Sequence, residues 1–129
     1  MKRKAGRAIV DAHHHFFDPV KNSFSTFLGS LGAPPYLPEA YATHLGGLTV
    51  SKTVHVEAMP DSGLEEAKWV DSLITTERCA VAAIVAGCNL ADVDAEAQLD
   101  ALKACSSRCL LYTSPSPRDA HESRMPSSA

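Results

Sequence analysis

The chain has 129 residues, of which 45% are hydrophobic and 6% aromatic, and its formal net charge is −3. This length suits at most one small domain of ordinary globular composition. The weakly acidic balance excludes strong electrostatic attraction to nucleic acid or to an anionic membrane, so we expect neither as a partner.

The sequence predicts neither an export signal nor a membrane span. The opening Met1–Lys4 is charged like the start of a signal peptide, but only a few apolar residues follow before Asp11. No apolar stretch approaches the roughly 20 residues that a spanning helix needs. Without an export signal we expect reduced thiols and a cytoplasmic location. The four cysteines also lack the paired spacing of a zinc site; they are Cys79, Cys88, Cys105 and Cys109.

The first part of the chain predicts one strand, a long connection and one helix. Residues 7–12 contain the short apolar run Ala8–Val10 and lead into three histidines, which favours a strand. Glycines and prolines interrupt residues 16–38, so we expect no regular structure there. Residues 37–47, LPEAYATHLGG, predict a helix with Pro38 in its first turn and Gly46-Gly47 at its end.

The middle of the chain alternates strands with helices. Residues 52–58, KTVHVEA, alternate and are rich in β-branched residues, which is typical of a strand. Ser62 and Glu65 have the spacing of a capping box and should open a helix that runs to about residue 76. The apolar run at 80–87 predicts a buried strand, and 92–104 a further helix. This order indicates an α/β fold with a parallel sheet.

The composition changes after residue 108. Residues 109–129 are mostly serine, proline and charged residues, and we expect them to be disordered. LLYTSPSPRD and SRMPSSA also resemble a translated sequencing adapter, so this tail is excluded from the fold as non-native. The sequence therefore predicts one partial domain over 1–108, which stops as a fourth strand begins.

Three histidines follow the first predicted strand. Side chains alternate across a strand, so Asp11, His13 and His15 should share one face, with His14 on the other. Two imidazoles at this spacing can reach one divalent ion at about 2.0–2.1 Å each. The alternatives are plain surface polarity and an affinity tag; the tag is disfavoured because only three histidines occur and Phe16 follows.

Four stretches in this order resemble the N-terminal part of the amidohydrolase-related family, in its sugar-lactonase-like branch. They are IVDAHHHFFDP, YLPEAY, VHVEAMPDSGLEEAKWVDSL and AIVAGCNLADVDAEAQLDAL, and the match spans about residues 8–108. The D-x-H-x-H start and the VHVEA strand are fairly specific when they occur together.

The resemblance implies the N-terminal portion of a (β/α)8 TIM barrel, with three to four βα units and no closure. It implies that His13 and His15 are metal ligands of a divalent ion such as zinc, although some relatives work without a tightly held metal. The catalytic aspartate of the family comes from a late strand and has no counterpart in this chain. The implied activity is hydrolysis of a lactone or amide bond in a small-molecule substrate.

Two further polar residues lie on the second predicted strand. His55 and Glu57 are two positions apart, so they should share a face and could bind substrate if that face lines the barrel mouth. The alternative is that both are satisfied interior polar residues. Asp11 could polarise a ligand histidine or accept from a backbone amide.

Two classes of function remain open at this point. The first is a metal-dependent hydrolase, with activity that belongs to a whole barrel of about 250 residues. The second is a chain without catalytic activity, either a truncated α/β fragment or a small α/β binding domain. Open sheet edges favour an inactive fragment.

Overall fold

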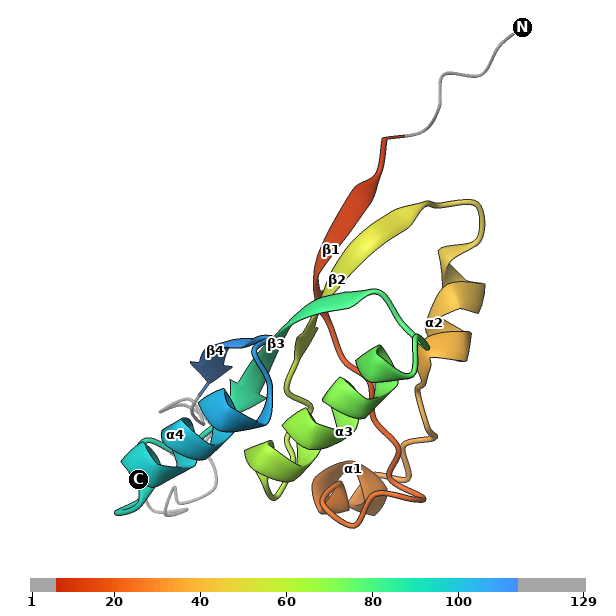
Figure 1. Ribbon diagram of the computed structural model, residues 1–129. Helices are drawn as coiled ribbons and strands as arrows, with labels where there is room; N and C mark the ends of the chain where they lie inside the picture. Colours follow the sequence, from red (N-terminus) through yellow and green to blue (C-terminus); the bar gives the residue numbers. More distant parts are fainter. Residues whose placement is uncertain (1–6, 114–129) are drawn as a thin grey trace, which may run out of the picture.

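The computed structural model describes residues 7–113 and shows an α/β arrangement (Figure 1). The elements alternate along the chain much as the sequence predicts. Strands are β1 (Ile9–His14), β2 (Val50–Val56), β3 (Val81–Gly87) and β4 (Cys109–Thr113). Helices are α1 (Thr26–Ser30), α2 (Pro38–Leu45), α3 (Gly63–Thr75) and α4 (Ala95–Cys105).

The four strands form one sheet in the order β1-β2-β3-β4, and every neighbouring pair is parallel. Each strand therefore lies beside the strand that precedes it in the chain. A doubly wound sheet reverses its order at a switch point, and no reversal occurs among the four described strands. A parallel α/β sheet is confirmed, while its closure into a barrel stays a prediction.

The core lies between the sheet and the pair α3 and α4, which pack side by side (Figure 1). One face of α3 is an apolar stripe that packs into this core, since Ala67 and Val70 are fully buried and Leu73 is 3% exposed. From the sheet, Ile84 meets this stripe, and Leu102 supplies the contact from α4. Burial of these apolar side chains is the main stabilising contribution of the described fold.

The start of α3 confirms the predicted cap and shows a close backbone approach. The Ser62 hydroxyl accepts a hydrogen bond from the Glu65 amide at 3.2 Å. The next residue, Gly63, lies so close to β3 that a Cβ atom there would be 1.7 Å from the Gly87 carbonyl oxygen. Glycine is therefore required at this position, because any side chain would push α3 away from the end of β3.

The connection from residue 16 to 38 is more ordered than predicted. Phe17 and Tyr36 form an antiparallel bridge with backbone hydrogen bonds of 3.0 and 2.8 Å. The buried Asp18 carboxylate accepts from the Val20 and Lys21 amides, and α1 follows within the loop. The sequence did not predict α1, because a five-residue helix is too short to show an apolar period among the surrounding glycines and prolines.

The predicted boundary at residue 108 needs a correction. Residues 109–113 were expected to be disordered, whereas they form β4 and pair with β3. A sheet edge offers backbone donors and acceptors to any extended segment, so pairing does not require a particular sequence. The remainder of the predicted tail, 114–129, lies outside the described residues. Within the described part, no helix is long and apolar enough to cross a membrane.

Candidate functional site

The His13 and His15 rings lie together at the carboxyl end of β1, on the same side as the alternation predicts. Their centroids are 5.0 Å apart and the ring planes are inclined by 77°. His13 is exposed and His15 half-buried, so both rings are open to solvent. Two imidazole nitrogens bound tetrahedrally to one ion at about 2.0–2.1 Å would put the centroids about 5 Å apart. The pair therefore fits two positions of one metal site.

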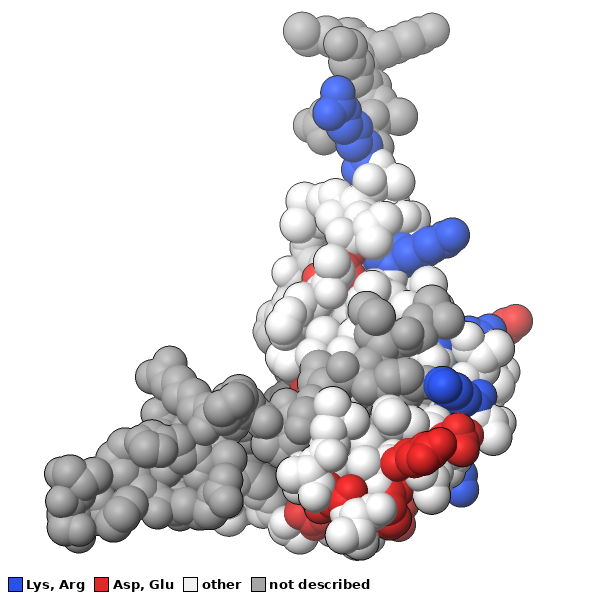
Figure 2. All heavy atoms as spheres, turned by 90° about the vertical axis from the view of Figure 1, so that its left-hand side faces the viewer, with Lys and Arg blue, Asp and Glu red and all other residues white. Residues whose placement is uncertain are grey.

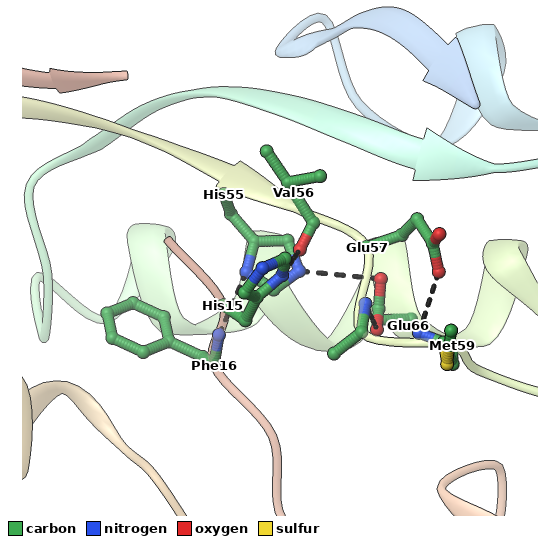
Figure 3. Close-up of polar contacts among 8 residues, drawn as sticks. His15, Phe16, His55, Val56, Glu57, Met59 and Glu66 are labelled. Carbon is green, nitrogen blue, oxygen red and sulfur yellow. Dashed lines mark hydrogen bonds and ion pairs between the residues drawn. The ribbon is translucent and has the colours of Figure 1, made fainter. Parts of the chain in front are cut away.

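The His15 ring is held by the second strand. Its Nδ1 atom lies 2.8 Å from the Val56 carbonyl oxygen, which can only accept, so Nδ1 carries the proton (Figure 3). The lone pair is then on Nε2. A histidine that donates one ring N–H to a backbone carbonyl is oriented for metal binding through its other nitrogen.

Asp11 does not share the face of His13 and His15, and this prediction was wrong. Asp11 pairs with Thr53 and His14 pairs with His55, so three residue steps along β1 lie opposite two steps along β2. This extra residue is a β-bulge, which reverses the alternation. The Asp11 carboxylate instead accepts from the Tyr41 hydroxyl at 2.6 Å and from the His13 amide at 3.1 Å.

The Asp11 contacts settle the choice that the sequence left open, in favour of a backbone amide. The Tyr41 hydroxyl and then the His13 amide lower the pKa of Asp11 below 3.8, because both donate to its ionised form. The hydrogen bond from the His13 amide to the Asp11 carboxylate also stabilises the bulge that turns His13 toward the open face.

His14 lies between the sheet and the helices. It is 7% exposed, and its ring lies 4.4 Å from the Phe16 ring and 5.0 Å from the Tyr41 ring, centroid to centroid. Its Nε2 atom is 2.8 Å from the Thr53 hydroxyl, while Nδ1 has no partner among the described residues. Burial, and then the neighbouring His55, lower the pKa of His14 to about 4. His14 is therefore a packed, neutral side chain.

His55 is fully buried on this same helix-facing side, so it does not line an open mouth. Its Nδ1 atom accepts from the Phe16 amide at 3.2 Å, which leaves the proton on Nε2. Nε2 faces a Glu66 oxygen at 3.4 Å, and the other Glu66 oxygen accepts from the Ala58 amide at 3.0 Å (Figure 3). The geometry favours the alternative of a satisfied interior residue over substrate binding.

Glu66 is the interior polar residue that sequence reasoning missed. It is 2% exposed on α3, where its carboxylate joins the helix to the end of β2. The available signal was its place one turn before Val70 on the apolar side of the helix, where a carboxylate needs buried partners.

Glu57 lies just beyond β2, apart from His55 and close to a cleft. Its carboxylate accepts from the Met59 amide at 2.7 Å and Met59 has a φ of 52°, a backbone conformation that is rare for a residue with a side chain (Figure 3). Glu57 thus shapes the loop between β2 and α3. It is half-buried and remains placed to contact a ligand.

The cleft has a volume of about 830 Å³ and lies where β2 and β3 end. Its walls are the loops after these two strands, together with the first turns of α3 and one side of α4. The carboxylates that line it are Glu57, Asp61, Asp92 and Asp94. Figure 2 shows acidic side chains gathered at the lower end of the molecule, and in Figure 1 both α3 and α4 begin toward that end.

Other polar residues give no complete metal site. Among residues 7–113, no group of three or more histidine, cysteine, aspartate or glutamate side chains is arranged to hold a metal ion. His44 on α2, to which we assign no role, bonds the Tyr36 hydroxyl at 2.8 Å. The His13–His15 pair therefore offers two ligands and needs others from outside this set.

Comparisons with known proteins do not assign the chain to a family. No family model matches the chain, and neither a curated protein nor a solved structure matches it. The likeness to the amidohydrolase-related family therefore stays a prediction from the four sequence stretches.

Proposed function

We propose that the chain belongs to a metal-dependent hydrolase of the (β/α)8 type that acts on a lactone or amide bond of a small molecule. His13 and His15 are the proposed ligands of a divalent ion, with zinc the first candidate because imidazole nitrogen suits it. The observation that carries this proposal is the His13–His15 pair, with ring centroids 5.0 Å apart.

The arrangement of the sheet supports the same proposal. Strands that follow one another in space and in sequence, all parallel, are what a (β/α)8 barrel requires. In such barrels the active site is built at the carboxyl ends of the strands. His13 and His15 are at that end of β1, and the 830 Å³ cleft lies at that end of β2 and β3.

Each residue has a defined part in this hydrolysis. His13 and His15 would hold a divalent ion, which would supply Lewis-acid activation of a water molecule and of the scissile carbonyl. The Val56 carbonyl holds the proton of His15 on Nδ1 and keeps Nε2 available as a ligand. Asp11 fixes the bulge that directs His13 to the same face. Glu57 holds the loop between β2 and α3 through the Met59 amide. We assign the role of general base to no residue of this chain.

The second candidate is a chain without catalytic activity. It is favoured by the two-ligand donor set and by β1 and β4, each of which pairs with one neighbour only among the described strands. We propose that the 129-residue chain alone is inactive and that turnover belongs to a larger barrel. A cytoplasmic location, without nucleic acid or membrane as partner, belongs to the same proposal.

Zinc binding tests the ligand pair. The 129-residue chain is titrated with zinc against a coloured chelator, and His13→Ala and His15→Ala should each weaken binding at least about tenfold, as expected when a ligand is lost. His44→Ala, an exposed histidine on α2, is the matched control and should bind like the parent chain. Equal affinity in all four proteins would refute the proposed ligands.

Lactone hydrolysis tests the inactivity of the chain. The parent chain with zinc should show no turnover above the same buffer with zinc alone. Turnover that disappears in both His13→Ala and His15→Ala would show that the chain forms a working site and would overturn the second part of the proposal.

A further inference from the structure

His15 lies just beyond β1 and is held by two consecutive residues of β2. The last residue of β1, His14, is paired with His55, so His15 follows the end of the strand. The His15 ring donates from Nδ1 to the Val56 carbonyl oxygen at 2.8 Å. The peptide bond after His15 donates its N–H, which belongs to Phe16, to Nδ1 of His55 at 3.2 Å (Figure 3). Val56 therefore holds the ring of His15, and His55 holds its backbone.

The hydrogen bond to the backbone exists in one tautomer of His55 only. Nδ1 of His55 accepts from the Phe16 amide, so the proton of the neutral ring is on Nε2. That nitrogen faces a Glu66 oxygen at 3.4 Å, and an ionised carboxylate can only accept. Glu66 therefore favours the tautomer of His55 that leaves Nδ1 free to accept from the backbone beside His15.

Burial and a second contact keep this pair in a fixed geometry. His55 is 0% exposed and Glu66 is 2% exposed. The other Glu66 oxygen accepts from the Ala58 amide at 3.0 Å, so the carboxylate is anchored independently of His55. The Phe16 ring stacks on the His55 ring, with centroids 6.2 Å apart and planes inclined by 30°. A buried polar network in which each member has a partner is rigid, and it can fix the position of its neighbours.

We propose that Glu66 is a positioning residue for His15 in the metal site, and that it acts through His55. This inference rests on the proposed function for its purpose, since Glu66 itself touches neither metal nor substrate. Without an acceptor at Glu66, His55 can carry its proton on Nδ1 and then points a donor at the Phe16 amide. The two donors repel each other, and the backbone that carries His15 loses its anchor.

The alternative is that Glu66 and His55 only join α3 to the end of β2. Both readings predict a less stable protein when the pair is disrupted, because a buried polar group then loses its partner. Only the positioning role predicts a change at the His15 ring, which is half-buried and in contact with Val56 rather than with α3. The tautomer of His15 is therefore the measurement that separates the two readings.

Nuclear magnetic resonance of the parent chain tests the network without any mutation. The nitrogen shifts of the histidine rings are measured with a chelator present, at about pH 8, where ordinary imidazoles are neutral. His55 should carry its proton on Nε2 and His15 on Nδ1. A coupling across the N–H···N hydrogen bond should link the Phe16 amide to Nδ1 of His55. A His55 ring protonated on Nδ1 would overturn the proposal, whatever the variants show.

Glu66→Gln removes one acceptor and keeps the size of the side chain. Its single amide oxygen cannot accept from both the Ala58 amide and His55, as the carboxylate does. His15 should then become a mixture of tautomers, and zinc affinity should fall about tenfold, the lower end of the range typical for partners of metal ligands. Glu65→Gln is the matched control, since Glu65 is the preceding, exposed residue of α3 and should behave like the parent.

Leu73→Ala separates positioning from a general loss of stability. Leu73 is buried on the same helix, about two turns beyond Glu66, and has no part in the hydrogen bonds of the pair. This variant should unfold at lower urea but keep the His15 tautomer and the zinc affinity of the parent. An equal change at His15 in Leu73→Ala and Glu66→Gln would overturn the proposal, as would an unchanged His15 in Glu66→Gln.

Failure of the proposed function gives a different result. If the parent chain binds no zinc, His13 and His15 are not metal ligands, whereas the metal-free tautomers of His15 and His55 still decide whether Glu66 positions His15. The two proposals are therefore tested by separate measurements on the same proteins.

Discussion

Acid should destabilise this protein through His14 as the pH falls from 6.5 toward 4. Its pKa is lowered from 6.5 to about 4, chiefly by burial among the rings and against Thr53. Between these two values the unfolded chain binds the proton and the folded chain does not. The stabilising contribution is therefore complete above pH 6.5 and is lost as the pH falls toward 4.

The magnitude follows from the width of this interval. Each pH unit between the two pKa values corresponds to about 1.4 kcal/mol, so the whole interval from pH 6.5 to 4 corresponds to about 3 kcal/mol. That is a large part of the 5–15 kcal/mol typical of a small domain. Asp11, whose pKa lies below 3.8, adds its own loss of stability only at lower pH.

Urea unfolding followed by far-ultraviolet circular dichroism measures the effect, with a chelator present to remove metal from His13 and His15. Stability is compared between pH 7 and pH 4 in the parent chain and in His14→Gln, which keeps a polar partner for Thr53 and does not titrate. The parent should lose about 3 kcal/mol more than the variant.

The control is His44→Gln, which changes an exposed histidine outside the buried cluster and should keep the acid response of the parent. An equal loss of stability in the parent and in His14→Gln would refute the reasoning, because His14 would then not be the group that takes up the proton.

Two further changes test the packing around the site. Gly63→Ala places a Cβ atom 1.7 Å from the Gly87 carbonyl oxygen and should destabilise the protein by about 2 kcal/mol or more, although alanine favours helices. Gly47→Ala, with nothing within 4 Å of its Cβ atom, should be nearly neutral in the same urea assay. Tyr41→Phe should raise the pKa of Asp11, measured by carbon NMR, because it removes the 2.6 Å hydrogen bond to the carboxylate. An unchanged Asp11 titration would contradict this assignment.

The order of strands and helices was open to prediction because hydrophobic periodicity and caps are local properties. The apolar run at 80–87 needed only its own side chains to be recognised, and the Ser62 cap needed only Glu65, three positions further on. The shared face of His13 and His15 was also predictable, because side chains two positions apart on a strand point to the same side.

What the tertiary structure decided is which face meets the helices. His55 has the same spacing from Glu57 whether it points into an open mouth or toward α3, and only the contacts with Glu66 and Phe16 make it interior. The predicted face of Asp11 was wrong for a similar reason. The bulge that reverses it arises from the pairing of β1 with β2, which the sequence of β1 alone does not define. A sequence pattern defines faces only relative to its own strand, whereas burial and strand register arise between segments that are distant in the chain.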